Sequence, residues 1–426
     1  MSIHNEMTIA VREHLWAPYL QDNLVNQSPT CKILDSMARM ISGPAGDGLA
    51  VVTGIDLATG RHYSGFDQAN TYGVPKGAVK NYITWAHYQS DVAMAETELI
   101  QNIGMTIRQV MTAEFTMSQV TSGQREELFS IAQQRYSRCG KTISFVKSAD
   151  LWGRAIPEYV SGEEHRRPEP LTKMFDYESE WNGLAPDELE EWQEGLHPWY
   201  ENPPNELPDS DSHRRYVNIP QIWGLDRSAS NTNNHGQTLE QGKLQLTKAV
   251  AETPLQYMQS VGGTYIVPVH PALWGPFSRE FDKESDSKIP IIMGWDMYRM
   301  GITCIQYYNA FFYIDDHAPT DRVWMLNVGT PEISDGQRQD AGFQMAYWLP
   351  ADLHREITGI MDNNTMNEDI VPNAIRMGRN GTLPLYPRGW DILPNHASAI
   401  GDRAQVTWAQ VGQYRWKNIC IMNLKE

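Results

Sequence analysis

The sequence predicts an α+β fold, because helical and strand periodicities occur in separate stretches of the chain. Residues 81–94 alternate aromatic and polar side chains, as a half-buried strand does. Residues 405–424 alternate in the same way and predict a closing strand or hairpin. Between them lies a helical pattern, in which apolar residues recur every three or four positions along one face: Leu99, Ile103, Ile107, Val110, Ala113, Met117 and Val120.

This apolar stripe predicts one helix from residue 96 to about residue 121, on the order of 40 Å long at ~1.5 Å per residue. Gly104 lies inside the stripe and marks a place for a kink. Thr121 and Gln124 have the spacing of a capping box, which predicts a second helix that stops near Gly140. A long helix with a single apolar stripe must lie along another element, and we expect a sheet.

The remaining elements are shorter. Residues 48–65 hold short apolar pieces broken by Gly, Asp and Thr, which indicates a β-hairpin or an extended loop. Residues 247–253 lie in a helical stretch, and residues 264–274 predict a strand that ends at one of two prolines. These prolines are Pro268 and Pro271. Residues 289–302 begin as a buried strand.

Composition places the chain among folded proteins. It has 426 residues, of which 41% are hydrophobic and 20% charged, so it can bury a core in roughly two to four domain-sized units. It contains no apolar run of about 18 residues and no apolar signal core, so we expect neither a membrane span nor secretion. The four cysteines lie far apart and predict reduced thiols: Cys31, Cys139, Cys304 and Cys420.

The formal net charge is -17 and no cluster of Lys and Arg is visible. Direct binding of DNA or RNA needs such a cluster, so the charge argues against it. Residues 150–215 hold eight prolines and most of the excess acidic charge, with one short helix expected at 187–196. We interpret this segment as an irregular surface insertion; a binding site for a cationic partner is the alternative.

The polar part of residues 311–327 raises the question of a metal site, because it places three carboxylates and an imidazole close together. These residues are Asp315, Asp316, His317 and Asp321. Their spacing matches neither a zinc motif nor a calcium loop. The pair Ala318 and Pro319 favours a tight turn, so a polar turn between two apolar strands is the simpler interpretation.

No other stretch supplies a catalytic motif. Residues 224–230 lack the spacing of a nucleophile elbow, and the adjacent Asp226 and Arg227 would point to opposite faces of a strand. The 14 Trp and 52 acidic residues would suit a glycosidase, but the sequence cannot place two carboxylates at the required separation. We therefore predict no catalytic, cofactor or metal residues, and keep a carbohydrate-active or metal-dependent enzyme as an alternative.

Three stretches in order resemble the major capsid proteins of tailed bacteriophages, which share the Hong Kong 97-like fold. Residues 81–110 are similar to the segment that enters the long spine helix of that family, with its Glu-x-x-x-Asn-x-Gly pattern at Glu98, Asn102 and Gly104. Residues 222–230 resemble the Gly-hydrophobic-Asp-Arg-Ser piece of these coats. Residues 311–327 resemble a hairpin of the family that ends in Leu-Asn, here Leu326 and Asn327.

The resemblance implies a coat protein that assembles into an icosahedral shell around a double-stranded DNA genome. It implies hexamers and pentamers of this chain in a virion assembled in the host cytoplasm, with portal, scaffolding or decoration proteins as further partners. An encapsulin-like compartment shell is a second alternative. Some of these coats crosslink through Lys and Asn, but Lys76 and Lys80 match no crosslink signature. We expect the arginines at the insertion's ends to pair with neighbouring chains: Arg166, Arg167, Arg214 and Arg215.

The resemblance and the composition together predict the order of segments along the chain. They are an N-terminal arm with one or two short helices (1–47), an extended loop (48–90), a peripheral domain with the spine helix (91–149), the acidic Pro-rich insertion (150–215), a connection to the peripheral domain (216–245), an axial domain (246–375) and a return to the peripheral domain (376–426).

Overall fold

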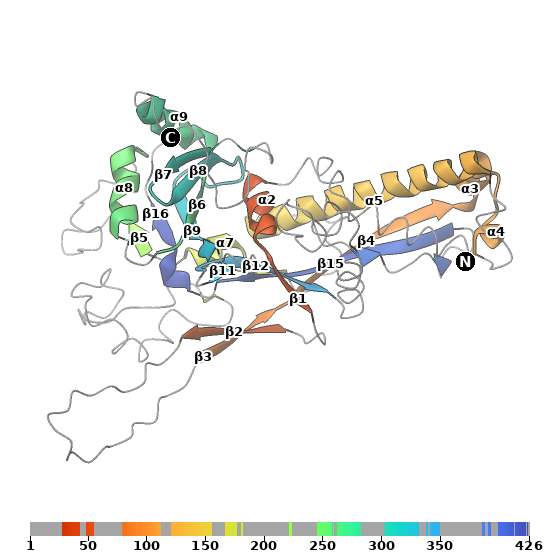
Figure 1. Ribbon diagram of the computed structural model, residues 1–426, viewed down its shortest axis with the longest axis horizontal. Coiled ribbons are helices and arrows are strands. Elements are labelled where there is room, and N and C mark those ends of the chain that lie inside the picture. The colour runs from red at the N-terminus through yellow and green to blue at the C-terminus, as the bar shows by residue number, and fades with distance from the viewer. Residues whose placement is uncertain are drawn as a thin grey trace, which may run out of the picture. The chain divides into compact units, whose positions relative to one another are not determined.

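A computed structural model confirms the α+β class, with helices packed on two larger sheets (Figure 1). The structure describes residues 28–42, 48–54, 79–111, 121–155, 167–176, 180–181, 221–223, 245–257, 259, 262–282, 302, 304–331, 338–339, 341–349, 386–387, 391–392, 399–412, 414–422 and 424.

The chain forms two compact units, each built from three separate stretches. Unit 1 comprises Met1–Gly46, Trp85–Pro168 and Met345–Ala409. Unit 2 comprises Asp47–Thr84, Glu169–Gln344 and Gln410–Glu426. The sequence-based boundaries at residues 245 and 375 do not coincide with these crossings, since the chain returns to unit 1 at Met345 and leaves it again after Ala409.

The sheet of unit 1 is organised around its longest strand, β15 (Ala399–Val411). Strand β4 (Ala86–Ala95) pairs antiparallel with β15 over ten residues, from Ala95 opposite Ala399 to Ala86 opposite Trp408. Shorter strands complete the sheet: β1 (Arg39–Ser42), β12 (Gln344–Leu349), β13 (Tyr386–Pro387) and β14 (Asp391–Ile392). The alternation predicted for residues 81–94 is confirmed, although the stretch divides into two strands at Trp85.

The two faces of the β4–β15 pair differ in chemistry. Val92 and Met94 of β4 are buried. On the other face, registered partners make polar contacts: His87 with Thr407 at 3.0 Å, and Gln89 with Gln405 at 3.3 Å. An antiparallel sheet with one packed and one solvated face produces this alternation.

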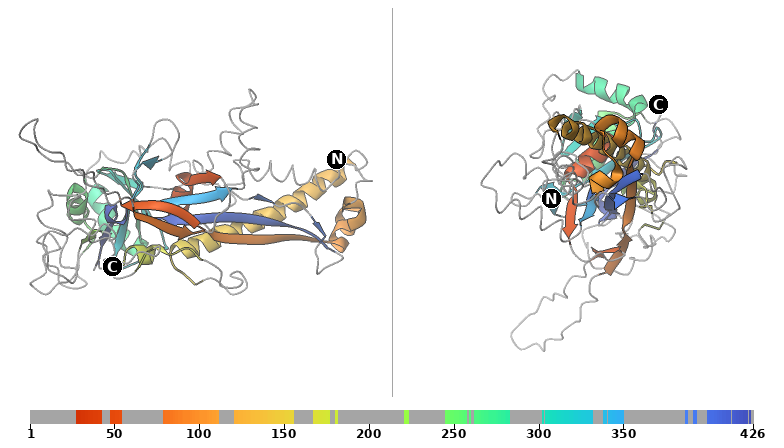
Figure 2. Two further views of the ribbon diagram at one scale, coloured as in Figure 1. Left: turned by 90° about the horizontal axis from the view of Figure 1, so that it is seen from below. Right: turned by 90° about the vertical axis from the view of Figure 1, so that its right-hand side faces the viewer.

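The long helix of unit 1 is α5 (Ser122–Leu151), which runs along β4 and β15 (Figure 2). Its predicted capping box is present, because Thr121 and Gln124 cap each other's backbone. At 30 residues it is about 45 Å long. The prediction that this helix stops near Gly140 is wrong. Gly140 is buried inside the helix, where packing offsets a cost of about 1 kcal/mol relative to Ala.

The single helix predicted for residues 96–121 is also wrong. The chain forms α3 (Glu96–Ile103) and then the short α4 (Ile107–Met111). Gly104 ends α3 in the left-handed region at φ 71°, with its N–H bonded to Ile100 and the next N–H bonded to Leu99. This C-cap stops the helix because glycine adopts positive φ without steric cost.

The predicted apolar stripe is nevertheless buried where it is described. Leu99, Ile107 and Val110 are each at most 5% exposed. The stripe therefore marks the buried face correctly, although it spans two helices rather than one. Its later members, at positions 113, 117 and 120, lie outside the described residues.

Unit 2 contains a mixed sheet in the order β5-β16-β9-β6-β8-β7. Its strands are β5 (Gln221–Trp223), β16 (Ile419–Ile421), β9 (Val323–Asn327), β6 (Tyr265–Val269), β8 (Ala310–Ile314) and β7 (Cys304–Tyr307). Strands β8 and β9 flank the predicted polar turn, but they do not form a hairpin. Strand β6 lies between them, parallel to β8 and antiparallel to β9, a pairing that sequence-local patterns do not reveal.

Strand β6 tolerates Pro268 because of where its partners end. Its pairing with β9 stops at Ile266, whereas its pairing with β8 continues to Val269. At Pro268, β9 no longer pairs with β6, so that side of the strand does not require a backbone N–H, which proline lacks. The strand ends at Val269, and Pro271 begins helix α9 (Pro271–Asp282), as proline does at a first helical position. Residues 272–274 are thus helical rather than extended.

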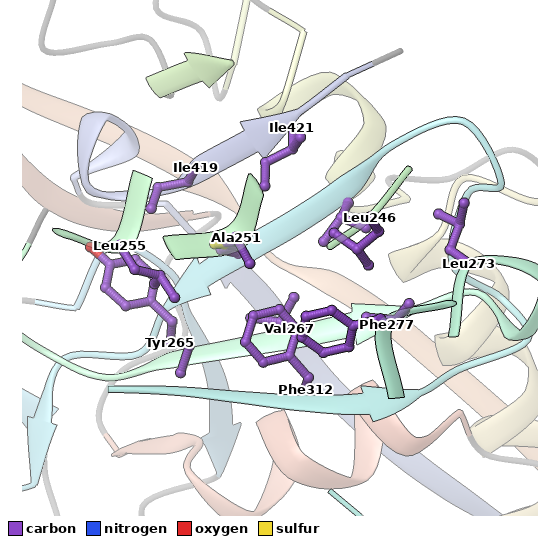
Figure 3. Close-up of a cluster of buried hydrophobic side chains, with 14 of the residues drawn as sticks. Leu246, Ala251, Leu255, Tyr265, Val267, Leu273, Phe277, Phe312, Ile419 and Ile421 are labelled. Carbon is purple, nitrogen blue, oxygen red and sulfur yellow. The ribbon is translucent and has the colours of Figure 1, made fainter. Parts of the chain in front are cut away.

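The core of unit 2 lies on one face of this sheet (Figure 3). Alternate residues Tyr265, Val267 and Val269 of β6 face it, as the period of a strand requires. Helix α8 (Lys248–Tyr257), which confirms the helix predicted there, contributes Ala251 and Leu255. Helix α9 contributes three buried residues: Leu273, Phe277 and Phe281.

The opposite face of this sheet is covered by part of the predicted surface insertion. Helix α7 (Leu171–Met174) is followed by Phe175, whose ring stacks on Trp324 of β9 with centroids 5.0 Å apart. Trp324 points away from Val323 and Met325, which belong to the core face. The interpretation of residues 150–215 as an irregular surface insertion is therefore wrong for residues 171–175. The segment's large apolar residues that the structure describes are buried: Leu151, Trp152, Leu171, Met174, Phe175 and Trp181.

Arg415 holds this covering segment in place. It lies in η5 (Arg415–Lys417), is 1% exposed, and donates hydrogen bonds to the carbonyls of Lys173, Met174 and Asp176. The guanidinium therefore adds hydrogen bonds to carbonyl groups at and just beyond the end of this short helix, where few backbone N–H partners are available. Burial lowers the pKa of Arg415 to about 10, so it remains charged at neutral pH.

The remaining described elements are α2 (Pro29–Ser36), the pair β2 (Gly48–Gly54) and β3 (Val79–Thr84), and the pair β10 (Thr330–Pro331) and β11 (Arg338–Gln339). Helix α2 agrees with the short helix expected in the N-terminal arm. Among the helices that the structure describes, none combines the length and apolar composition needed to cross a bilayer. Residues 187–196, 224–230 and 289–301 lie outside the described part.

The core in Figure 3 generates a stability prediction. Replacing the fully buried Phe277 by Ala should lower the free energy of unfolding by about 3–5 kcal/mol, because a large apolar side chain is lost and a cavity remains. The matched control is Ile314→Ala, since Ile314 is 41% exposed. Chemical denaturation of both variants measures the difference. Equal losses for the two would contradict the assigned core.

Candidate functional site

The turn between β8 and β9 brings together three of the four residues singled out as metal ligands. One ligand atom each of Asp315, Asp316 and His317 lies within 4.8 Å of the others. The Nδ1 atom of His317 is 2.7 Å from an Asp316 oxygen and 3.4 Å from an Asp315 oxygen. Asp321 pairs with the adjacent Arg322 at 2.7 Å instead.

The hydrogen bonds of Asp315 show how the turn is built. Its buried carboxylate accepts the backbone N–H of His317 at 2.9 Å, which is the pattern of an Asx turn. Its own N–H donates to Val269 at the end of β6, and its carbonyl accepts the N–H of Ala318. These hydrogen bonds give Asp315 a structural role in the turn, as the turn interpretation predicts.

The two carboxylates stabilise the protonated form of the imidazole. Hydrogen bonding to Asp315, and then to Asp316, raises the pKa of His317 above its ordinary value, and partial burial opposes this only in part. The charged imidazolium is thus the form that the folded turn favours.

A second cluster, which the sequence analysis missed, lies in unit 1. We call it the Lys147 cluster; it consists of Asp35, Lys147, Tyr347 and Trp408. The Nζ atom of Lys147 contacts Asp35 and the Tyr347 hydroxyl, and lies 4.7 Å and 5.5 Å from the ring centroids of Tyr347 and Trp408. Burial lowers the pKa of Lys147 to about 7.

The Leu-Asn ending of β9 has a structural role. Asn327 is fully buried, donates to the carbonyl of Gly262, and accepts the N–H of Gly329 at 2.9 Å. The side chain of Asn418 accepts the N–H of Asn327 at 2.9 Å. A Cβ atom at Gly263 would come within 2.8 Å of the Asn327 amide, so this buried network requires glycine there.

Of the four arginines expected to pair with neighbouring chains, the structure describes Arg167, and it has a partner within its own chain. Arg167 donates to the buried Asp150 at 2.7 Å and to the carbonyl of Arg154 at 3.1 Å. Burial raises the pKa of Asp150 to about 6, although the guanidinium of Arg167 opposes this shift. Arg167 therefore already has an acidic partner in its own chain and does not need one from a neighbouring chain. Arg166, Arg214 and Arg215 lie outside the described residues.

Some apolar side chains remain exposed and could contact other molecules. They are Tyr82, Ile100, Phe145, Tyr308 and Ile314. Tyr82 is the most exposed of them, at 70%, and lies on the two-stranded ribbon β2–β3.

Glu98, which the resemblance singled out, pairs with Arg135 at 2.9 Å. Lys76, Asp226 and Arg227 lie outside the described residues, and Lys80 lies on β3.

No protein-family model and no curated protein matches the chain. Among solved structures, it is similar to the capsid asymmetric unit of cyanophage A-1(L), at 11% identity and a TM-score of 0.41 over 94% of each chain. It is similar to the holo-SrpI encapsulin complex of Synechococcus elongatus PCC 7942, at 9% identity and 0.37 over 91% of this chain and 85% of that one. A virus-like particle from Pyrococcus furiosus matches at 7% identity and 0.37, over 95% and 97%.

The turn interpretation predicts that the protein carries no functional metal. Elemental analysis of the purified protein should find no stoichiometric Zn, Mn or Fe, because the Asx turn and the His317–Asp316 contact occupy the potential ligands. One equivalent of metal per chain, lost in His317→Ala, would contradict this interpretation.

The raised pKa of His317 predicts a pH-dependent contribution to stability. The contribution is fully present below the unfolded value of about 6.5 and is lost as the pH rises through the folded value. His317→Gln should therefore lower the free energy of unfolding more at about pH 5 than at about pH 8. Denaturation at both pH values measures this. An equal effect at both would show that the carboxylates do not stabilise the imidazolium.

Proposed function

We propose that the chain is a major capsid protein with the Hong Kong 97-like fold, which assembles into the shell of a tailed bacteriophage. The order of the described elements carries the proposal. A short helix α2 is followed by the ribbon β2–β3, the long strand β4, the long helix α5, a separate mixed-sheet unit, and the returning strand β15. This is the order that the sequence resemblance implies: arm, extended loop, spine helix, axial domain and return.

The ribbon β2–β3 supplies a physical reason for self-association. A two-stranded ribbon is at best marginally stable in water when it packs on nothing else. Among the described elements, β2 and β3 pack chiefly on each other, and Tyr82 on β3 is 70% exposed. Contact with a neighbouring copy would bury this aromatic surface. Tyrosine suits such contacts because it adds a large apolar area with few rotamers to fix.

The charge of the chain fits an enclosing rather than a binding role toward DNA. At a formal net charge of -17, the coat repels the phosphate backbone instead of holding it. We infer that packaged DNA is enclosed without sequence-specific contacts. The same proposal makes the protein a structural rather than an enzymatic one. Its location is the virion, assembled in the host cytoplasm, with portal, scaffolding or decoration proteins as further partners.

A point substitution on the ribbon tests this proposal. Tyr82→Asp should leave the free energy of unfolding within about 0.5 kcal/mol of the parent, because the side chain is exposed. It should reduce shell formation, measured by light scattering, at least tenfold, since a charge replaces the buried aromatic at each copy of the contact. Tyr82→Phe is the matched control and should assemble like the parent.

Normal assembly of Tyr82→Asp would contradict the role of the ribbon, and a strictly monomeric parent protein at all concentrations would contradict the coat proposal itself. The content of purified particles separates the coat from a compartment shell. Double-stranded DNA inside the particles supports the coat, whereas a protein cargo without DNA supports the compartment.

A further inference from the structure

The Lys147 cluster joins three segments of unit 1 that are distant in the sequence. Asp35 lies near the end of α2, Lys147 lies in the last turns of α5, and Tyr347 lies on β12. The side chains of Asp35 and Lys147 are both 0% exposed. The amine and the carboxyl group are therefore held in contact and away from solvent, which is an unusual setting for two ionisable groups.

Burial changes the chemistry open to this pair. In water a lysine amine is protonated and a carboxylate is anionic, and neither form reacts with the other. An apolar environment disfavours both charges, so a proton shared between them favours the neutral amine and the neutral acid. The complete burial of both side chains provides that environment. The lowered pKa of Lys147, about 7, agrees with this setting.

The hydroxyl of Tyr347 contacts both groups. It donates a hydrogen bond to Oδ1 of Asp35 and accepts one from Nζ of Lys147. A donor on the carboxyl oxygen stabilises negative charge that develops there when a nucleophile attacks the carbon. The same hydroxyl can pass a proton from nitrogen to oxygen. Cys31, which interacts electrostatically with both Lys147 and Asp35, has a pKa raised to about 12 by burial and stays a neutral thiol.

We propose that Lys147 and Asp35 of the same chain join in an intramolecular isopeptide bond. The neutral Nζ attacks Cγ of Asp35, and a C–N bond forms. The carboxyl hydroxyl leaves with one proton from the nitrogen, so that one C–O bond breaks and one water molecule is released. No oxidant, reductant or cofactor takes part. This inference does not rest on the proposed function.

The bond would fasten the N-terminal helix to the end of the long helix. Its two ends are 112 residues apart in the chain. A covalent link over a loop of this length restricts the unfolded chain and so stabilises the folded one, as a long-range disulfide does. The link would also prevent α2 from leaving unit 1.

Mass spectrometry of the denatured full-length protein tests the bond directly. We expect an intact mass below the calculated value by the mass of one water molecule. We also expect trypsin to leave Lys147 uncut, because its amine is an amide. The digest should contain a branched peptide in which residues 33–39 are joined to residues 142–154. The calculated mass, with both peptides recovered separately and with cleavage at Lys147, would overturn the proposal.

Three comparisons sharpen the test. Lys173 and Glu169 form an exposed ion pair at 3.2 Å, and trypsin should cut after Lys173 in the same digest. Lys147→Arg should have its full calculated mass, since arginine keeps the charge but not the nucleophile. Tyr347→Phe keeps the aromatic ring and should contain at least several-fold less linked protein in newly made samples. Complete linkage in Tyr347→Phe would overturn the role given to the hydroxyl.

Discussion

The ten-residue pairing of β4 with β15 is the constraint on which unit 1 depends. It joins residues near position 90 to residues near position 403, so the first and last thirds of the chain must both be in place before the sheet exists. Helix α5 packs against the buried face of this pair. The other face carries the polar cross-strand contacts. Because such contacts are distant in sequence, the unit carries a large loop-closure cost that its packing must offset.

In unit 2 the corresponding constraint is the insertion of β6 between β8 and β9. This strand order places α8 and α9 on one face of the sheet, and leaves Trp324 on the other face for Phe175 to cover. Both faces are therefore buried, which explains why the strands are apolar at nearly every position. Arg415 and the Asn327–Asn418 network then fix the loops around the sheet through buried hydrogen bonds.

Patterns within a single element were predictable from the sequence, whereas contacts between distant elements were not. Alternation located β4, and the spacing of Thr121 and Gln124 located the start of α5. The apolar stripe gave the right buried face but hid the break at Gly104, because a stripe can continue across a C-cap. Nothing local links Asp35 to Lys147, which lie on separate helices, so the Lys147 cluster could not be found without the structure.

We propose that the exposed ribbon of this chain packs against another copy of the chain. An electron cryomicroscopy map of the purified particles tests that claim most directly. We expect a closed shell in which β2 and β3 lie against a neighbouring copy, with Tyr82 buried at the contact. A map in which the ribbon lies in solvent or folds onto its own copy, or particles that never form, would contradict it.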